Sequence, residues 1–272
     1  MSDETSILVL GIDELASAVA RKLHLAGHAV AIHQPTPPRT IRRRMAFADA
    51  WTDGSCAFEG VEAHRADKSK DFLAALRSGA FIPVLRHPFE DVTTRWPWDV
   101  IVDARTETAD APEKLRHRGD FTIGLGAGYC AGEHCDVVID IGARDPGAVL
   151  RHGSILREER AEDKRFADGR MVLAPRHGVF HAAKRICEPI AKGELIGCVG
   201  ATELAAPASG RIRGLARDGA AVARGAEIAE IALPKAEFVG ITRRDKLIAR
   251  SVAFVIEMER AGYAPITLES FL

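Results

Sequence analysis

The first thirty residues contain a strand, a glycine turn, a helix and a second strand, in that order. Ile7–Leu10 is a short apolar run that ends at Gly11, which is typical of a buried strand entering a turn. From Leu15 to Leu25 apolar residues recur at helical spacing, and Gly27 supplies the stop. Residues 28–32 give the second strand. Because the crossover in such a unit makes its two strands parallel, the N-terminal half is predicted to contain a parallel sheet.

The same half of the chain continues to alternate between strands and helices. Further apolar strands are predicted at residues 81–85, 98–103, 121–125 and 137–141. This alternation indicates a Rossmann-like α/β domain over residues 1–150. Residues 151–171 are dense in charge and poor in apolar side chains, which favours an exposed connection between domains.

A repeat with a spacing of 32 residues follows this connection. Pro175–Gly178 is matched by Pro207–Gly210, and residues 190–196 are matched by residues 222–228. Two β-rich halves in tandem, with glycines at the turns and alternating aliphatic residues, predict a compact β module over residues 172–235. A final segment, residues 236–272, contains apolar residues at helical spacing between positions 243 and 258, so we expect a C-terminal helix that packs on a core.

The repeated module resembles the biotinyl/lipoyl barrel, in which such motifs open and close each half. Carrier domains of that type present a modified lysine on the hairpin between the halves. No lysine occurs here between Lys192 and Lys235. We therefore expect a lipoyl-like sandwich barrel without the carrier function.

Composition and charge exclude several classes of protein. The formal net charge is −1, so no overall field favours nucleic acid or an anionic membrane. No run of 18 apolar residues is present, and the polar, acidic N-terminus is unlike a secretory signal, so no membrane association is expected. Five cysteines at irregular spacing favour a reducing compartment, which predicts a cytoplasmic protein.

The first glycine turn is a candidate cofactor-binding site. Gly11 and Asp13 lie where a dinucleotide fingerprint would, after a strand and at the start of a helix. Asp13 replaces the second glycine of that fingerprint, and its charge would repel a pyrophosphate. The alternative is that the turn has no nucleotide role and that Asp13 caps the helix.

Two further clusters could bind an anion. Arg42, Arg43 and Arg44 could hold a phosphate through their guanidinium groups, or could simply lie on a solvated helix start. The alternating glycines Gly124, Gly126 and Gly128 could form an anion-binding nest of backbone N–H groups, or a tight crossover packed on the sheet.

No catalytic group and no metal site are assigned. The run that contains Cys130, His134 and Cys135 lacks standard zinc spacing and has no second pair of ligands, so these thiols are interpreted as structural. No Ser-His-Asp order, catalytic carboxylate pair or P-loop can be defended from the sequence.

Together, these segments resemble the selenium-dependent molybdenum-hydroxylase system proteins, distant relatives of the xanthine and carbon monoxide dehydrogenase maturation factors. The likeness includes the Gly11 turn, the arginine cluster, the glycine loop and a Val-Asp-Ala-Arg segment with Asp103 and Arg105. We count Asp103 and Arg105 among the cofactor-binding candidates on this basis.

The resemblance implies an accessory protein that matures a molybdenum hydroxylase. The arginines and the glycine loop would hold molybdopterin, a phosphate-bearing small molecule, and the barrel would dock the client enzyme. One alternative is an NAD(P)-dependent oxidoreductase in which the arginines recognise a 2′-phosphate. Another is a non-catalytic Rossmann-like scaffold. Assembly into a homo-oligomer is left open.

Overall fold

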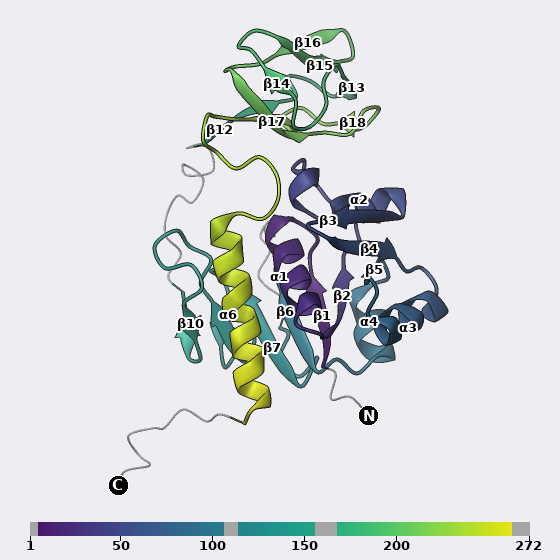
Figure 1. The fold of residues 1–272 in the computed structure, drawn as a ribbon, viewed down its shortest axis with the longest axis vertical. Helices are drawn as coiled ribbons and strands as arrows, with labels where there is room; N and C mark the ends of the chain where they lie inside the picture. The colour runs from purple at the N-terminus through teal and green to yellow at the C-terminus, as the bar shows by residue number, and fades with distance from the viewer. Residues whose placement is uncertain (1–4, 106–113, 156–167, 263–272) are drawn as a thin grey trace.

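A computed structural model describes residues 5–105, 114–155 and 168–262 of the chain, and Figure 1 shows their arrangement. Nine strands form one large sheet in the order β10-β9-β7-β6-β1-β2-β5-β4-β3. Seven of them run parallel to one another, while β3 and β10 run antiparallel at the two edges. The strands of this sheet are β1 (Ser6–Leu10), β2 (Ala29–His33), β3 (Ser55–Phe58), β4 (Val61–Arg65), β5 (Ile82–Leu85), β6 (Val100–Asp103), β7 (Phe121–Leu125), β9 (Val137–Ile139) and β10 (Val149–Leu150).

The Rossmann-like parallel sheet predicted for residues 1–150 is therefore corrected to a mixed sheet. Both departures have a local cause. Glu59 and Gly60 adopt positive φ angles in a two-residue turn, which folds β3 and β4 into an antiparallel hairpin. At the other edge, Gly147 (φ 94°) lies in the turn that brings β10 back against β9. The predicted strand–helix–strand unit itself is confirmed, because β1 and β2 pair in parallel on either side of a helix.

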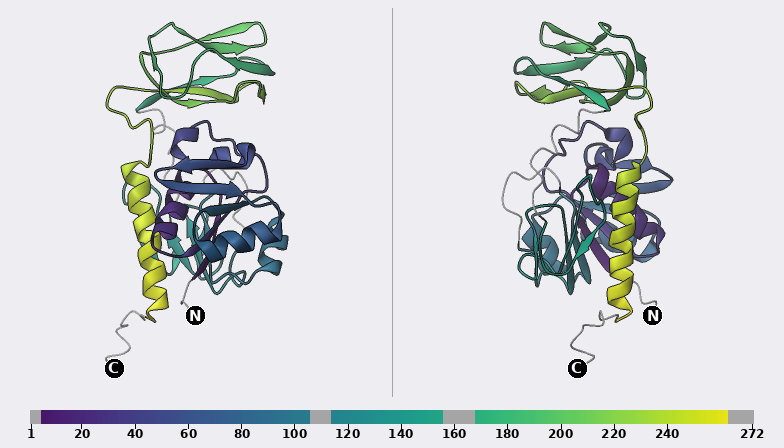
Figure 2. Two further views of the ribbon diagram at one scale, coloured as in Figure 1. Left: turned by 45° about the vertical axis from the view of Figure 1, so that its right-hand side comes forward. Right: turned by 90° about the vertical axis from the view of Figure 1, so that its left-hand side faces the viewer.

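Helices cover both faces of the large sheet. Ile7 and Val9 pack in one core with α1 (Glu14–Leu25) and α6 (Arg243–Arg260), which lie side by side in both views of Figure 2. Leu8 and Leu10 face a second core on the other side. The shorter helices are η1 (Arg43–Met45), α2 (Ala48–Asp53), α3 (Ser69–Ser78) and α4 (Phe89–Arg95).

The predicted C-terminal helix is confirmed as α6. The hydroxyl of Thr242 accepts a hydrogen bond from the Asp245 backbone N–H, which caps the helix N-terminus. Ile248, Val252 and Ile256 are buried against the sheet, as the spacing predicted. Leu247, which the same pattern placed on the buried side, is 40% exposed. No helix in the described ranges is long and apolar enough to cross a membrane.

The lipoyl-type barrel predicted for residues 172–235 was wrong. Two separate four-stranded antiparallel sheets, β12-β19-β17-β14 and β16-β15-β13-β18, face each other across an apolar core, and no closed barrel forms in the described residues. Glycines at turns and alternating apolar residues predict β-hairpins. They do not require hydrogen bonds between the two sheets that would close them into a barrel. The strands are β12 (Gly169–Leu173), β13 (Gly178–Ala182), β14 (Pro189–Ile190), β15 (Leu195–Val199), β16 (Thr202–Ala205), β17 (Gly210–Leu215), β18 (Ala221–Val222) and β19 (Glu227–Ala232).

The repeat in the sequence corresponds to a repeat in this β-sandwich. Gly178 and Gly210, 32 positions apart, each begin a strand, and β14 and β18 occupy equivalent places in the two halves. A Cβ at Gly210 would lie 2.1 Å from the Ala232 carbonyl oxygen, so a side chain is excluded there. Most of the charged connection predicted over residues 151–171 lies outside the described residues.

Candidate functional site

The carboxyl ends of β1, β6 and β7 bring several of the predicted site residues together. Gly11 follows β1, Asp103 and Arg105 lie at the end of β6, and Gly124 belongs to β7, where it is paired with Asp103. A Cβ at Gly11 would lie 3.3 Å from the Arg105 side chain. The topology therefore makes these segments neighbours at one edge of the sheet, where ligands of α/β proteins commonly bind.

Two of the glycine amides at this edge already donate hydrogen bonds to the protein backbone. The Gly11 N–H donates to the His33 carbonyl oxygen (2.9 Å), and the Gly126 N–H donates to that of Ile139 (2.9 Å). Gly11, Gly126 and Gly128 all have positive φ angles, which explains why glycine occupies these positions. Gly124 has a different reason, because a Cβ there would lie 2.4 Å from the Tyr129 ring. Backbone conformation and packing thus account for these glycines without a bound anion.

Asp103 is the centre of a buried polar cluster beside these glycines. Its side chain is fully buried, and it accepts hydrogen bonds from Arg105 Nε at 2.9 and 3.2 Å. Burial, together with the charge of Asp103 and a hydrogen bond to it, raises the pKa of Tyr129. A buried carboxylate needs such partners, so Arg105 has a structural role here whether or not it also meets a ligand.

Asp13 caps helix α1, as predicted by the alternative in which the turn has no nucleotide role. Its Oδ1 accepts a hydrogen bond from the Ala16 backbone N–H at 3.0 Å. The interaction satisfies one of the N–H groups that a helix leaves unpaired in its first turn. The binding roles suggested for Asp13 and for the glycines remain predictions, as does the identity of any cofactor, molybdopterin or NAD(P).

The arginine cluster lies where the α/β part meets the β-sandwich. Arg42 forms two hydrogen bonds with Glu230 of β19 (2.6 and 2.8 Å). Arg43 donates to Asp49 at 3.2 Å and to the Leu215 carbonyl oxygen at 3.3 Å. Only Arg44 of the three is exposed. Two of the three predicted phosphate ligands therefore bind protein groups across the junction.

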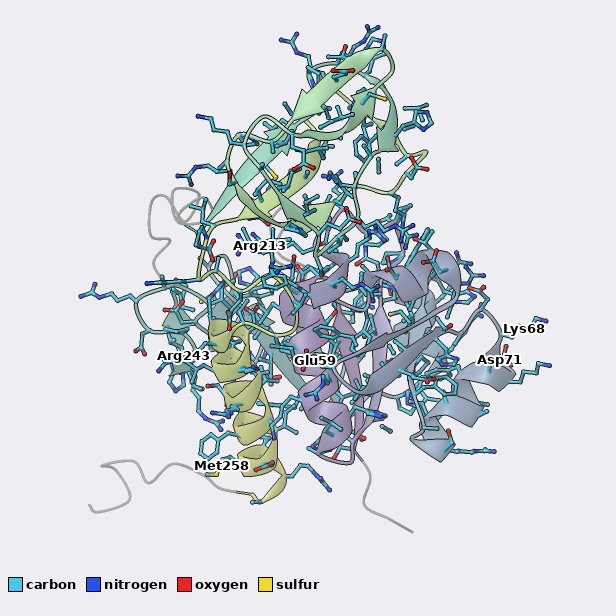
Figure 3. The ribbon with its side chains drawn as sticks, turned by 45° about the horizontal axis from the view of Figure 1, so that its top comes forward. Glu59, Lys68, Asp71, Arg213, Arg243 and Met258 are labelled. Carbon is cyan, nitrogen blue, oxygen red and sulfur yellow. The ribbon has the colours of Figure 1, made fainter. Side chains whose placement is uncertain are left out.

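A second arginine extends the ion pairs of this junction. Arg213 of β17, labelled in Figure 3, donates to Glu230 (2.5 Å) and to Asp168 (2.9 Å). The side chains of Arg213 and Glu230 are 4% and 2% exposed. Hydrogen bonds from Arg42 and Arg213 outweigh the effect of burial and hold the pKa of Glu230 below its ordinary value. The carboxylate therefore stays ionised between two cations.

Glu14 lies at the edge of this network and has an unusual pKa. Burial and the neighbouring charge of Asp13 raise the pKa of Glu14 from 4.5 to about 7, although Arg42 is 3.8 Å away and Thr40 donates a hydrogen bond of 3.0 Å. A carboxyl whose pKa is raised by folding stabilises the protein while it is protonated. That contribution is lost as the pH rises from about 4.5 towards 7.

Replacing Glu14 by Gln should remove this pH dependence. At pH 8 the variant should be more stable than the wild type by about 1–3 kcal/mol. This range lies below the free energy that the whole pKa shift would give, because about a fifth of the Glu14 side chain is exposed and water weakens the effect. At pH 4 the two proteins should have nearly equal stability. Urea denaturation at a series of pH values measures the difference, and a constant offset across this range would contradict the assignment.

A separate cavity of about 260 Å³ lies between α3 and α4, on the opposite side of the α/β part from α6. Lys68, at the start of α3, is labelled in Figure 3. The walls are mainly apolar and aromatic, and three charged residues, Lys68, Asp91 and Arg95, contribute to the lining. The other lining residues are Ala66, Ser69, Phe72, Leu73, Leu85, His87, Val92, Trp96 and Trp98.

The aromatic side chains of this pocket contact one another. The ring of Phe72 packs edge-on against Trp96, with centroids 5.4 Å apart, and tilted against Trp98 at 5.9 Å. Trp98 Nε1 donates to the Val92 carbonyl oxygen at 3.2 Å. The Nε1–H of Trp96 is buried and has no hydrogen-bond partner in the described structure. The pocket was not predicted from the sequence, because its residues lie in segments that the sequence marks only as apolar strands and helices.

A second, more open hollow of about 300 Å³ adjoins the first through His87. Arg86 lies over the Trp51 ring at 5.1 Å and pairs with Asp67 at 2.9 Å. Pro35 completes its lining. Since Arg86 is already bound to a carboxylate and an aromatic face, we regard this hollow as an extension of the pocket and not as a separate site.

The cysteines near the glycine loop show no metal site. No group of three or more potential ligands is placed to hold a metal within the described residues. The Cys130 backbone N–H donates to His134 Nδ1 at 2.9 Å, and Cys135 Sγ donates to the Val137 carbonyl oxygen. Burial raises the pKa of Cys135 to about 11. The structural role inferred for these thiols stays a prediction.

Comparisons with known proteins give one relative and several solved structures. No family model matches the chain. Escherichia coli strain K12 has a protein, YqeB, described as uncharacterized, that is 30% identical over 266 residues, covering 93% of this chain and 47% of YqeB. The chain thus spans about half the length of that relative. Solved structures include aspartoacylase family proteins from Mesorhizobium loti and Rhodobacter sphaeroides, each 14% identical with a TM-score of 0.27, over 86% of this chain and 87% of theirs.

These names contradict the resemblance that the sequence motifs suggested. The solved structures are described as aspartoacylase or succinylglutamate desuccinylase family proteins, and no relative named here is a molybdenum-hydroxylase system protein. The assignment as a maturation protein with a molybdenum hydroxylase client was therefore wrong, and so were its alternatives, the NAD(P)-dependent oxidoreductase and the Rossmann-like scaffold. The motifs behind the assignment are short, and the structure gives local reasons for several of them, such as helix capping at Asp13 and ring packing at Gly124.

Proposed function

We propose that the chain binds a small organic anion with a flat apolar body in the pocket between α3 and α4. The observation that carries the proposal is the aromatic cavity of about 260 Å³ with cationic side chains in its lining. Ligand sites are typically concave, mainly apolar, and supplied with a few polar groups that fix orientation. The proposal includes a cytoplasmic location, which the five free cysteines favour.

The charges of the lining favour an anion over a neutral ligand. Lys68 and Arg95 provide two positive charges, and Asp91 provides one negative charge that lies 3.9 Å from Arg95. This pair is long and exposed, so it holds Arg95 only weakly. Lys68 is exposed at the start of α3, where the helix dipole also favours negative charge.

The aromatic walls favour a flat apolar body on that anion. Phe72, Trp96 and Trp98 offer ring faces and edges, which bind aromatic groups better than branched aliphatic ones. A buried donor without an acceptor is costly, by about 1–3 kcal/mol. An oxygen atom of a bound ligand would provide an acceptor for the Trp96 N–H after a small turn of the indole.

The proposal is tested with phenylacetate and its neutral analogue phenylacetamide. The chain has three tryptophans, two of which line the pocket, so the indole N–H signals in a ¹⁵N–¹H spectrum report binding directly. Phenylacetate should shift the signals of Trp96 and Trp98 more than that of Trp51. Phenylacetamide should bind at least about tenfold more weakly, because a charge-assisted hydrogen bond is lost.

The variant Lys68→Met should weaken phenylacetate binding by about tenfold and leave phenylacetamide binding unchanged. Lys70→Met is the matched control, because Lys70 is an exposed lysine on the same helix that does not line the pocket. Equal binding of the two compounds, or equal effects of the two lysine variants, would refute the anionic ligand. Shifts confined to Trp51, which lines only the open extension, would refute binding between α3 and α4.

A further inference from the structure

The outer surface of the β-sandwich contains a cysteine, a histidine and an aspartate close together. In the strand pair β13–β15, Phe180 lies opposite Val199 and His181 lies opposite Cys198. Phe180 and Val199 are fully buried in the sandwich core. Because side chains alternate along a strand, His181 and Cys198 project from the other face of the sheet. His181 is exposed, and Cys198 is partly exposed.

His181 and Cys198 are direct cross-strand neighbours. Residues opposite each other in an antiparallel pair have Cβ atoms about 4.5–5.5 Å apart, so a thiol and an imidazole in these positions can meet. Gly197 is required beside them, since a Cβ there would lie 2.3 Å from the His181 carbonyl oxygen. The close approach of the two strands is therefore a fixed feature of the sheet.

Asp218 lies beside the histidine. Its Oδ1 lies 3.5 Å from His181 Nδ1 and accepts a hydrogen bond of 3.0 Å from the Ala182 backbone N–H. A carboxylate at Nδ1 fixes the tautomer of the ring and leaves Nε2 to accept a proton. The order carboxylate, imidazole and thiol is the arrangement that activates a cysteine nucleophile.

We propose that Cys198 is a site of thiol–disulfide exchange with a small disulfide. His181 takes the thiol proton, and the Cys198 thiolate attacks one sulfur of the disulfide. A bond forms between Cys198 Sγ and that sulfur, the original S–S bond breaks, and the other half leaves as a thiolate. The product is a mixed disulfide on the outer face of the sandwich, remote from the pocket between α3 and α4.

Two of the other cysteines, Cys56 and Cys135, are set apart by burial. Burial raises the pKa values of Cys56 and Cys135 to about 11, which keeps both as unreactive thiols at neutral pH. Cys130 is partly exposed, with its Sγ 3.9 Å from the Ala131 carbonyl oxygen. Cys187 is also partly exposed and lies on the sandwich, so it is the matched control for Cys198.

The test follows the reaction of the folded, reduced protein with 5,5′-dithiobis(2-nitrobenzoate). A fast phase equivalent to one thiol should be lost in Cys198→Ser and kept in Cys187→Ser. His181→Asn should slow that phase at least tenfold, while Asp218→Asn should slow it less, because it acts only through the histidine. The neutral reagent iodoacetamide should show the same order of variants, which excludes a simple attraction of the anionic reagent to the imidazolium.

Glutathione disulfide provides the second measurement. Mass spectrometry of a digest should find the mixed disulfide on Cys198 before any other cysteine. Circular dichroism of each variant confirms that the fold is retained. A fast phase that survives Cys198→Ser, an unchanged rate in a folded His181→Asn variant, or first modification at Cys187 would each overturn the proposal.

Discussion

Replacing Glu230 by Gln will lower the free energy of unfolding by about 3–5 kcal/mol, the range expected when one partner of a buried ion pair is removed. Glu230 accepts hydrogen bonds from both Arg42 and Arg213, and its side chain is 2% exposed. Glutamine has nearly the same shape but carries no charge. Arg213 would then keep only Asp168 as an anionic partner, and its Nε already lacks a hydrogen-bond acceptor in the described structure.

The pH dependence distinguishes the loss of charge from a change in packing. The pKa of Glu230 is lowered by folding, so its contribution is present above the unfolded value of 4.5 and is lost as the pH falls through the folded value. The wild type should therefore lose more stability in acid than Glu230→Gln, and the difference between them should narrow below pH 4. Urea denaturation at pH 7 and at lower pH values measures both effects.

Arg217→Ala provides the control at the same junction. Arg217 pairs with Asp49 and Asp53, but about a third of its side chain is exposed. Its removal should change stability by about 1 kcal/mol or less, as for other exposed ion pairs. If Glu230→Gln lowered the free energy of unfolding no more than Arg217→Ala does, the buried ion pairs of Glu230 would not be what fixes the sandwich to the α/β part.

Features that depend on neighbouring residues were predictable from the sequence. The spacing of apolar residues identified α1 and α6, and the capping role of Asp13 required only the start of the helix. The antiparallel edges of the large sheet were missed, because a short apolar strand has the same composition whichever way it runs. The facing sheets of the sandwich were mistaken for a barrel, because the residues at the turns do not indicate whether the edge strands pair with each other.

Contacts between distant residues were not predictable from local patterns. Arg42 and Glu230 are separated by 188 positions, and nothing near either residue indicates its partner. The arginine cluster was therefore interpreted as a phosphate site, when two of its members hold the junction. Cys198 and His181 were missed for the same reason, because only the register of β13 and β15 makes them neighbours. Pairing of strands, and not composition, decides these sites.

Replacing Gly124 by Ala will destabilise the α/β part by about 3 kcal/mol, at the upper end of the usual cost of overpacking. The added Cβ would lie 2.4 Å from Tyr129 Cγ and within 2.9 Å of two more ring atoms. Tyr129 is 6% exposed and its side chain forms a hydrogen bond with Asp103, so an outward movement of the ring would break the polar cluster. An anion-binding nest would instead predict a loss of ligand affinity with little loss of stability.

A double-mutant cycle tests the steric origin of this effect. Tyr129→Ala removes the ring, so the cost of Gly124→Ala should fall by about 2 kcal/mol or more in that background, whereas Tyr129→Phe keeps the ring and should leave the cost nearly unchanged. Gly132→Ala serves as the control, since its φ of 89° is strained for alanine but no atom lies within 4 Å of the added Cβ. That variant should lose only about 1–2 kcal/mol. Thermal and urea denaturation measure each variant, and an equal cost of Gly124→Ala in all three backgrounds would show that the Tyr129 ring is not the reason for this glycine.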